Sequence, residues 1–421
     1  MHYKLRHVQE KIKRLAQHSK VILIVGARQV GKSTLLKNLF PSIPRIVFER
    51  TGSNYGASTD PGAFLRQHPS PLILDEVQYV PQLFSSIKRI VDECDSPGRY
   101  FLTGSHNLGI LKHAAESMAG RVCIVDLEHM TFLEESEAFT FTGDSQNPPS
   151  WLEIYLEKPD SLPFQFAGLA TEQTPAHAVW RGGFPAFLDV PDKDLFARRQ
   201  GYLETYLFRD AIYAEPTAAN TKFERFLEIK AVLSGQEITH EHFGRELGLE
   251  DSLIARWDYI LQQTYQWREI PPYFGNALKR VTKRAKGYMT DSGLACQLQG
   301  IYSPLSLLGD RQFGPLFETY CVNMLHGLMS NLDALPRVYH WRSKEQEEVD
   351  ILLHMNGKLY PIEIKTASRV SKDDTRGIMA LRETYGAMVQ HGIILYTGTL
   401  CYHLNDHVTA LPFNALMKQR D

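Results

Sequence analysis

Short apolar runs alternate with polar stretches along the first third of the chain. The runs predict strands at residues 21–25, 45–49, 71–74, 99–103 and 121–126. This alternation is typical of a mostly parallel sheet with helices on its faces. Ahead of the first strand, residues 4–18 have an amphipathic helical pattern with Lys and Arg on the polar face. We favour a helix that packs beside the first strand, and the alternative is a nucleic-acid-binding arm.

The pattern changes twice further along the chain. Residues 137–178 are polar and contain several prolines, which indicates a boundary or an insertion, and residues 190–265 have largely helical patterns. After residue 305 the pattern predicts a third section, with helices and strands at 315–330, 347–364, 373–389 and 391–397. We therefore expect three domains, at residues 1–200, 201–304 and 305–421.

Composition narrows the class of protein. The chain has 421 residues and a formal net charge of -2, so a nucleic-acid surface would have to be a local patch. Its five cysteines are scattered without a C-x-x-C pair, which argues against a disulfide framework or a zinc site and favours a reducing compartment. The apolar runs are far shorter than a membrane span, and no apolar segment follows the basic N-terminus. We expect a cytoplasmic protein with no membrane partner.

A phosphate-binding loop follows the first predicted strand. Residues 26–33 fit G-x-x-x-x-G-K-[ST], between the apolar run 21–25 and a helical run that starts at Thr34. Glycines let backbone amides surround phosphates, and the helix N-terminus adds the positive end of its dipole. Lys32 is expected to reach the β- and γ-phosphates, and the Ser33 hydroxyl to ligate Mg²⁺. The predicted ATP-binding residues of this loop are Gly26, Ala27, Arg28, Gln29, Val30, Gly31, Lys32, Ser33 and Thr34.

Polar residues end the next two predicted strands of the sheet. The run Leu-Ile-Leu-Asp-Glu at 72–76 is expected to place Asp75 at the metal ion and to leave Glu76 to polarise the attacking water. The strand at 99–103 is followed by Ser105. Either Ser105 or Thr103 senses the γ-phosphate at the ligand crevice, and the alternative is a hydroxyl that caps a turn.

Two arginines are candidates for a finger that meets the γ-phosphate of a neighbouring subunit. They are Arg121, in Ala-Gly-Arg-Val, and Arg209, in Phe-Arg-Asp. Such a finger would make hydrolysis depend on assembly into a homo-oligomer. The alternative for each arginine is a surface ion pair.

A helix–turn–helix pattern and a basic stretch occupy the middle of the chain. Residues 236–265 predict two helices around a turn at Gly248, and strands near 267–271 and 285–290 would complete a winged helix. No acid occurs from 271 to 290, so the cations there would suit a DNA backbone. A protein-docking role is the alternative, since acids lie on the second helix. The predicted DNA-binding residues are Lys279, Arg280, Lys283, Arg284 and Lys286.

The last section carries a looser pattern of carboxylates and a lysine. Asp350 ends one predicted strand, and alternation puts Glu363 and Lys365 on one face of the next strand. With Glu318 on the preceding helix, these groups can converge. Two carboxylates with Mg²⁺, here Asp350 and Glu363, together with a lysine can activate water against a phosphodiester. A hairpin salt bridge between Glu363 and Lys365 is the alternative.

These motifs together resemble a known family. Gly-Ala-Arg-Gln-Val-Gly-Lys-Ser-Thr, Leu-Asp-Glu-Val-Gln, Leu-Thr-Gly-Ser and Ala-Gly-Arg-Val are similar to segments of the AAA-type ATP-binding proteins of bacteria and archaea, whose core precedes an uncharacterised C-terminal domain. Trp-Arg-Gly-Gly-Phe-Pro at 180–185 and Thr-Asp-Ser-Gly-Leu at 290–294 extend the resemblance over nearly the whole chain. It implies an α/β P-loop AAA+ core, a helical and winged-helix domain, and an α/β restriction-endonuclease-like tail with the PD-(D/E)XK pattern, in which Val349 replaces the usual proline.

The expected function is that of a Mg²⁺-dependent AAA+ ATPase that binds duplex or branched DNA, such as Holliday junctions. It would couple ATP hydrolysis to DNA remodelling or processing, and nuclease activity stays open. The alternative is a nucleotide-dependent signalling switch that binds a protein partner and has an inactive nuclease-like tail. A small-molecule kinase is disfavoured, because Glu76 suits water activation and the sequence indicates no second substrate pocket.

Overall fold

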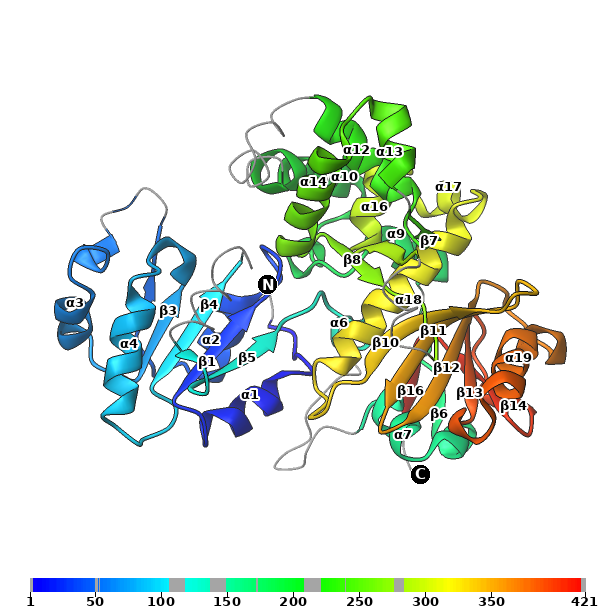
Figure 1. The fold of residues 1–421 in the computed structure, drawn as a ribbon, viewed down its shortest axis with the longest axis horizontal. Coiled ribbons are helices and arrows are strands. Elements are labelled where there is room, and N and C mark those ends of the chain that lie inside the picture. Colours follow the sequence, from blue (N-terminus) through cyan, green and yellow to red (C-terminus); the bar gives the residue numbers. More distant parts are fainter. Residues whose placement is uncertain are drawn as a thin grey trace.

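The computed structural model describes residues 3–49, 52, 54–105, 118–136, 149–171, 173–207, 221–238, 240–275 and 284–417. Figure 1 shows a parallel sheet with its helices, a helical region and a second, mixed sheet, which confirms the predicted α/β class. Within these ranges each helix is too short or too polar to span a bilayer.

The first sheet consists of five parallel strands in the order β2-β3-β4-β1-β5. Their side chains alternate between two apolar layers. One layer packs on the first two helices and the other on the next two, and α1 docks beside β1 as we favoured. The elements of this unit are α1 (Gln9–Ala16), β1 (Val21–Val25), α2 (Lys32–Leu39), β2 (Arg45–Val47), α3 (Pro61–Gln67), β3 (Leu72–Asp75), α4 (Leu83–Asp92), β4 (Tyr100–Gly104), β5 (Val122–Asp126) and α6 (Phe132–Glu135).

The helical region contains a small sheet of three antiparallel strands in the order β7-β9-β8. Two helices around a left-handed Gly248 (φ 60°) and two strands after them lie where the sequence predicts them. The elements are α9 (Pro175–Arg181), α10 (Asp192–Tyr202), α12 (Thr221–Val232), β7 (Gln236–Glu237), α13 (His240–Leu247), α14 (Asp251–Gln263), β8 (Trp267–Ile270), β9 (Lys286–Met289), α16 (Ser292–Leu298) and α17 (Pro304–Leu308).

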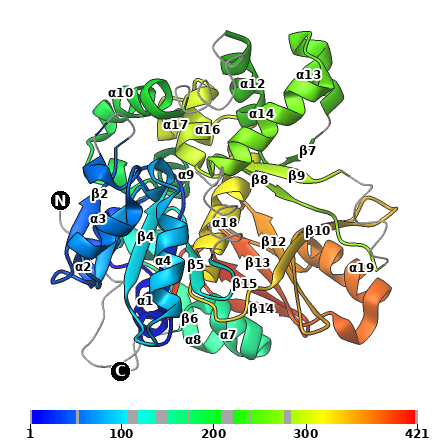
Figure 2. The same ribbon diagram turned by 60° about the vertical axis from the view of Figure 1, so that its left-hand side comes forward.

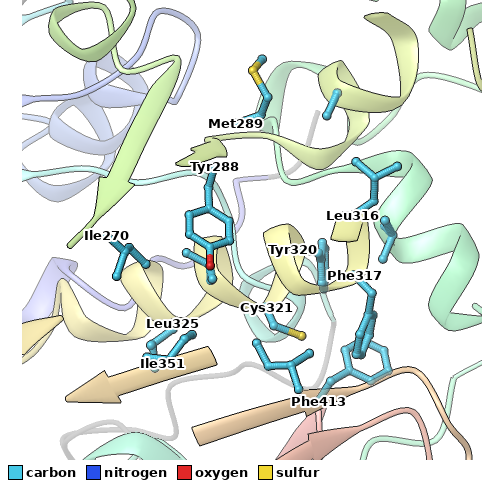
Figure 3. Packing of buried hydrophobic residues seen from close by; sticks show 14 of the residues in the cluster. Ile270, Tyr288, Met289, Leu316, Phe317, Tyr320, Cys321, Leu325, Ile351 and Phe413 are labelled. Atoms are coloured by element: carbon cyan, nitrogen blue, oxygen red, sulfur yellow. The ribbon is translucent and has the colours of Figure 1, made fainter. Parts of the chain in front are cut away.

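The second sheet has six strands in the order β10-β11-β12-β13-β15-β14, in which β12, β13 and β15 are parallel to one another. One face packs on α18 and the opposite face on α19. Figure 3 shows Leu325 of α18 between Ile270 of the helical region and Ile351 of the sheet. The elements are α18 (Phe313–Met329), β10 (Arg337–Arg342), β11 (Glu348–Met355), β12 (Lys358–Lys365), α19 (Arg376–Tyr385), β13 (Gly392–Tyr396), β14 (Tyr402–Asn405) and β15 (Val408–Pro412).

An early segment of the chain packs on this second sheet. Helices α7 (Trp151–Glu157) and α8 (Leu162–Gln165) lie beside it, and β6 (Phe166–Gly168) pairs with β16 (Ala415–Met417) (Figures 1 and 2). The Tyr155 hydroxyl lies 3.0 Å from the Pro361 carbonyl and 2.9 Å from the His391 carbonyl. The described residues 149–171 therefore belong with the C-terminal unit, whereas the sequence placed them in a first domain that ends at residue 200.

Two motifs of the family resemblance meet at Asp291, which is buried. Its carboxylate accepts hydrogen bonds from the backbone N–H of Gly183 (2.8 Å) and of Leu294 (2.7 Å). A Cβ atom at Gly182, where φ is 68°, would lie 2.5 Å from the Asp291 carboxylate. The Gly183 carbonyl in turn accepts from Met130 N–H in the segment after β5 (2.8 Å). These motifs thus connect the first sheet to the helical region.

Candidate functional site

The predicted phosphate-binding loop joins β1 to α2 at the carboxyl edge of the first sheet. Gly26 and Gly31 have φ angles of 150° and 97°, and Gly31 is the residue before the first turn of α2. A Cβ atom at Gly26 would lie 2.3 Å from the Leu127 carbonyl oxygen, so only glycine fits where the loop passes the chain that leaves β5. The free N–H groups of α2 begin at this loop.

Lys32 lies folded across the loop. Its Nζ donates hydrogen bonds to the carbonyls of Gly26 (2.9 Å) and Ala27 (2.8 Å), and the residue is buried. Burial lowers the pKa of Lys32 to about 8, although the carboxylates of Glu76 and Asp75 act in the opposite direction. The ammonium is therefore poorly solvated and would gain from phosphate oxygens.

Asp75 and Glu76 lie at the same edge, at the end of β3. The Asp75 carboxylate accepts a hydrogen bond from the Thr103 hydroxyl and lies 3.5 Å from Arg45 Nη1. Glu76 adopts left-handed backbone angles (φ 59°, ψ 48°), and its Oε2 accepts from the Ser105 hydroxyl at 2.9 Å and from the Gln78 amide. The structure thus brings Lys32, Asp75, Glu76 and Ser105 together at one edge of the sheet, where three parallel strands end.

A cavity of about 740 Å³ opens in front of this edge. Lys32, Ser33, Thr34 and Glu76 line one side, and the opposite side comes from the segment around Pro185 to Leu188 and from helix α10, which contributes the exposed Arg198. The volume lies in the range of pockets that enclose small-molecule ligands and cofactors. Arg198 was missed by the sequence prediction, because nothing in the pattern of α10 shows that this helix faces the loop.

The residues at this edge fit the magnesium ion that the resemblance implies. Mg²⁺ prefers oxygen ligands and keeps several waters, with one or two protein oxygens and the phosphates completing its shell. The Ser33 hydroxyl borders the cavity, and the Asp75 carboxylate is buried at the end of the neighbouring strand. These two side chains would hold the ion.

Arg6 braces the loop from the N-terminal segment, and no sequence motif indicates this role. Its Nη1 donates to the Val30 carbonyl at 3.0 Å, its Nη2 to the Glu128 carbonyl at 2.5 Å, and its Nε lies 3.2 Å from the Glu134 carboxylate. The residue is buried, so this network fixes the loop against the segment after β5.

Of the two candidate finger arginines, the structure describes Arg121, which does not line this cavity. Arg121 precedes β5, at the amino edge of the sheet, and pairs with Asp92 of α4, which is the surface ion pair given as its alternative. Any contact with a nucleotide would therefore have to be made to another subunit, and that role stays a prediction. Arg209 lies outside the described residues.

A second cavity, of about 470 Å³, brings together the four predicted residues of the last section. Glu318 comes from α18, Asp350 from β11, and Glu363 and Lys365 from β12. The Asp350 carboxylate accepts from Ile364 N–H at 2.9 Å, and Lys365 Nζ lies 2.7 Å from Glu363 Oε1. We call this cavity the C-terminal pocket.

Lys286 of β9 contacts acids that line the C-terminal pocket, which corrects its prediction as a DNA contact on an exposed wing. Its Nζ lies 3.1 Å from Glu318 Oε1, 3.2 Å from Asp350 Oδ1 and 2.5 Å from Glu348 Oε1. The residue is only 5% exposed, because β9 is the central strand of its sheet and the carboxylates compensate the buried charge. Of the other four cations predicted to bind DNA, Arg284 is exposed, and the rest lie outside the described residues: Lys279, Arg280 and Lys283.

As they stand, Asp350 and Glu363 do not fit the predicted magnesium ion. Lys286 and Ile364 N–H engage the two oxygens of Asp350, and Lys365 engages one oxygen of Glu363. Across the described part of the chain, no cluster of three or more His, Cys, Asp or Glu has an arrangement that would hold a metal ion. Burial and the neighbouring Asp350 raise the pKa of Glu318 to about 7, and the same two causes raise the pKa of Glu363 well above its usual value.

Comparisons with known proteins match successive parts of the chain. Residues 18–135 match the family described as AAA domain, residues 173–305 match the domain of unknown function DUF8612, and residues 313–416 match the domain of unknown function DUF4143. The uncharacterized proteins Rv2008c of Mycobacterium tuberculosis and Mb2031c of Mycobacterium bovis are each 26% identical over 416 residues, which cover 98% of this chain and 84% of theirs.

Two solved structures have a low similarity to parts of the chain. The Walker-type ATPase PABY2304 of Pyrococcus abyssi is 15% identical, with a TM-score of 0.42, over 71% of this chain and 99% of its own. The RuvB Holliday junction branch migration motor of Thermotoga maritima is 14% identical, with a TM-score of 0.31, over 64% of this chain and 90% of its own. The family match at residues 18–135 coincides with the sheet that carries the phosphate-binding loop, and it supports an AAA-type ATPase unit there.

Proposed function

We propose that the chain hydrolyses ATP with Mg²⁺ in the cavity between the phosphate-binding loop and α10. The observation that carries this proposal is the convergence of Lys32, Ser33, Asp75 and Glu76 at one edge of a parallel sheet. Lys32 would bind the β- and γ-phosphates, and Glu76 would orient and polarise the attacking water. Mg²⁺, when bound by Ser33 and Asp75, supplies charge neutralisation at the phosphates.

Calorimetry and a phosphate-release assay on the full chain test this proposal. Mg·ATP should bind with measurable heat and be hydrolysed, and EDTA should abolish turnover. Lys32→Ala should weaken nucleotide binding, since the loop loses its only side-chain ammonium. Well-folded protein that gives no heat with Mg·ATP would overturn the proposal.

Arg198 is expected to contact the phosphates from α10 within one chain. Arg198→Ala should weaken ATP binding by about 10- to 100-fold, because a hydrogen bond to a charged group contributes roughly 1.5–3 kcal/mol. Calorimetric titration with ATP measures the change. Lys193→Ala, on the same helix and away from the cavity lining, is the matched control, and equal affinity of the two variants would contradict the assignment.

We further propose that a homo-oligomer of this chain couples hydrolysis to the binding of duplex or branched DNA. Contacts after β5 support coupling between the nucleotide cavity and the helical region. The Glu128 carbonyl accepts from Arg6, which braces the loop, and the Glu128 carboxylate pairs with Arg268 of β8 at 2.7 Å. A movement of the phosphate-binding loop would therefore displace β8, the strand that precedes the basic stretch.

Arg284 is the exposed cation in the described part of that stretch. Arg284→Ala should weaken DNA binding at moderate salt several-fold, and reduce the slope of log affinity against log salt by about 1, because one phosphate contact is lost. Fluorescence anisotropy with duplex and four-way DNA at several salt concentrations measures both. Arg89→Ala on α4 is the matched control, since Arg89 is exposed on the first unit. An unchanged salt slope for Arg284→Ala would count against a DNA-binding wing.

A nucleotide-dependent switch that binds a protein partner is the second candidate, and the pairing of Lys286 with Glu318 and Asp350 of the C-terminal pocket favours it. Wild type and the double variant Asp350→Ala/Lys365→Ala should be compared for Mg²⁺-dependent nicking of linear, forked and four-way DNA. If neither protein nicks any of the three DNA substrates, and no DNA stimulates ATP turnover, the result would favour the switch.

A further inference from the structure

Strand β9 of the helical region supplies two side chains to the acidic groups of the C-terminal unit. Lys286 and Tyr288 are two positions apart and therefore lie on one face of the strand. The Tyr288 hydroxyl donates to Glu318 Oε1 at 2.7 Å, and Figure 3 shows this side chain extending from its strand toward α18. Both residues are buried, so this is a packed junction between two units and not a surface ion pair.

The Lys286 ammonium lies among three carboxylates. It contacts one oxygen each of Glu318, Glu348 and Asp350. A divalent cation would require carboxylate oxygens at roughly 2.0–2.6 Å. An ammonium at about 3 Å from the same oxygens already fills their volume and compensates their charge, and a second cation there would be repelled.

The other side of the pocket has an acceptor that Lys286 does not reach. Glu363 is 7% exposed and lines the pocket, and its Oε2 is buried with no hydrogen-bond partner in the described structure. Leaving a buried oxygen unpaired costs free energy. Glu363 Oε2 and the Asp350 carboxylate would become available together to a cation if Lys286 were withdrawn.

We propose that Lys286 is a built-in counter-ion that keeps the C-terminal pocket closed to divalent metal ions, so that Asp350 and Glu363 bind no Mn²⁺ or Mg²⁺ while this ammonium is in place. This inference goes beyond ATP hydrolysis and does not depend on it. It also connects the two units physically, because the strand that follows the basic stretch carries the residue that closes the pocket.

Mn²⁺ binding to the full chain, without nucleotide, tests the proposal. Electron paramagnetic resonance measures free Mn²⁺, and therefore the number of Mn²⁺ ions bound per chain, for each protein with and without Asp350→Asn. The difference between the two numbers reports binding in the C-terminal pocket alone. Wild type and the charge-conserving Lys286→Arg should show no difference. Lys286→Met should bind one additional Mn²⁺ per chain, and Asp350→Asn should remove it.

The proposal would be overturned if the wild-type protein bound a Mn²⁺ ion that the Asp350→Asn variant does not bind. This comparison needs no change at Lys286. A folded Lys286→Met that gains no Mn²⁺ would overturn it as well. Because this variant leaves carboxylates without their counter-ion, its melting temperature is measured with and without Mn²⁺. If Mn²⁺ raises the melting temperature of Lys286→Met, and the added Asp350→Asn change abolishes this effect, the proposal is supported. If Mn²⁺ does not stabilise Lys286→Met, the result counts against the proposal. ATP hydrolysis should persist in either case, so failure here is distinguishable from failure of the proposed function.

Discussion

Replacement of Glu76 by glutamine is expected to lower kcat for ATP hydrolysis by about 100- to 10,000-fold while ATP affinity stays near that of the wild type. The amide keeps the size of the side chain, and its carbonyl oxygen can still accept the hydrogen bond from Ser105. It cannot accept a proton from the attacking water. Lys32 and the loop glycines, which would bind the nucleotide, are unchanged.

Single-turnover hydrolysis together with calorimetric ATP binding separates the two effects. Glu93→Gln, an exposed carboxylate next to the end of α4, is the matched control and should leave both quantities unchanged. Normal hydrolysis by Glu76→Gln would show that another group activates the water. A parallel loss of ATP affinity and melting temperature would instead show that Glu76, with its left-handed backbone, mainly shapes the end of β3.

Ser105 and Gln78 both donate hydrogen bonds to the Glu76 carboxylate. A general base that is hydrogen-bonded to two side chains must exchange one of these bonds for the water that it polarises. Ser105 lies at the end of β4, and its hydroxyl donates a hydrogen bond to the Glu76 carboxylate, which is the proposed general base. Its role toward a bound phosphate stays a prediction.

The first sheet was predictable because its signals are local. Apolar runs of strand length, a loop that needs two glycines with positive φ, and acids at a strand end are each readable within a few residues. The pairing of Glu363 with Lys365 was predictable for the same reason, since alternation alone puts them on one face.

The missing parts of the site depend on contacts between distant segments. Lys286 sits in a stretch of cations that resembles an exposed loop, and its burial becomes understandable only when Glu318 and Asp350 are seen beside it. Arg198 has an ordinary exposed position on α10, and its relation to the loop arises from tertiary packing. Likewise, residues 149–171 join the last strand of the chain through a two-stranded pairing that no local pattern indicates.

A buried ion pair under the helix–turn–helix is expected to dominate the stability of the helical region. Lys230 of α12 is 0% exposed, pairs with Asp258 of α14, and places its Nζ 4.3 Å from the centre of the Trp267 ring of β8. Burial lowers the pKa of Lys230, although Asp258 acts in the opposite direction. The Lys230 ammonium thus connects α12 with α14 and with β8, the strand that precedes the basic stretch.

Lys230→Met should lower the free energy of unfolding by about 3–5 kcal/mol, because the buried Asp258 carboxyl group would lose its partner in an apolar interior. Urea unfolding followed by circular dichroism and tryptophan fluorescence measures the loss, which is large against the roughly 5–15 kcal/mol of a typical domain. The double variant Lys230→Met/Asp258→Leu removes both charges and should recover most of that loss, since apolar replacements of a buried pair are often neutral. Additive losses in the double-mutant cycle would contradict a coupled pair, and would mean that the two side chains stabilise the helices independently through packing.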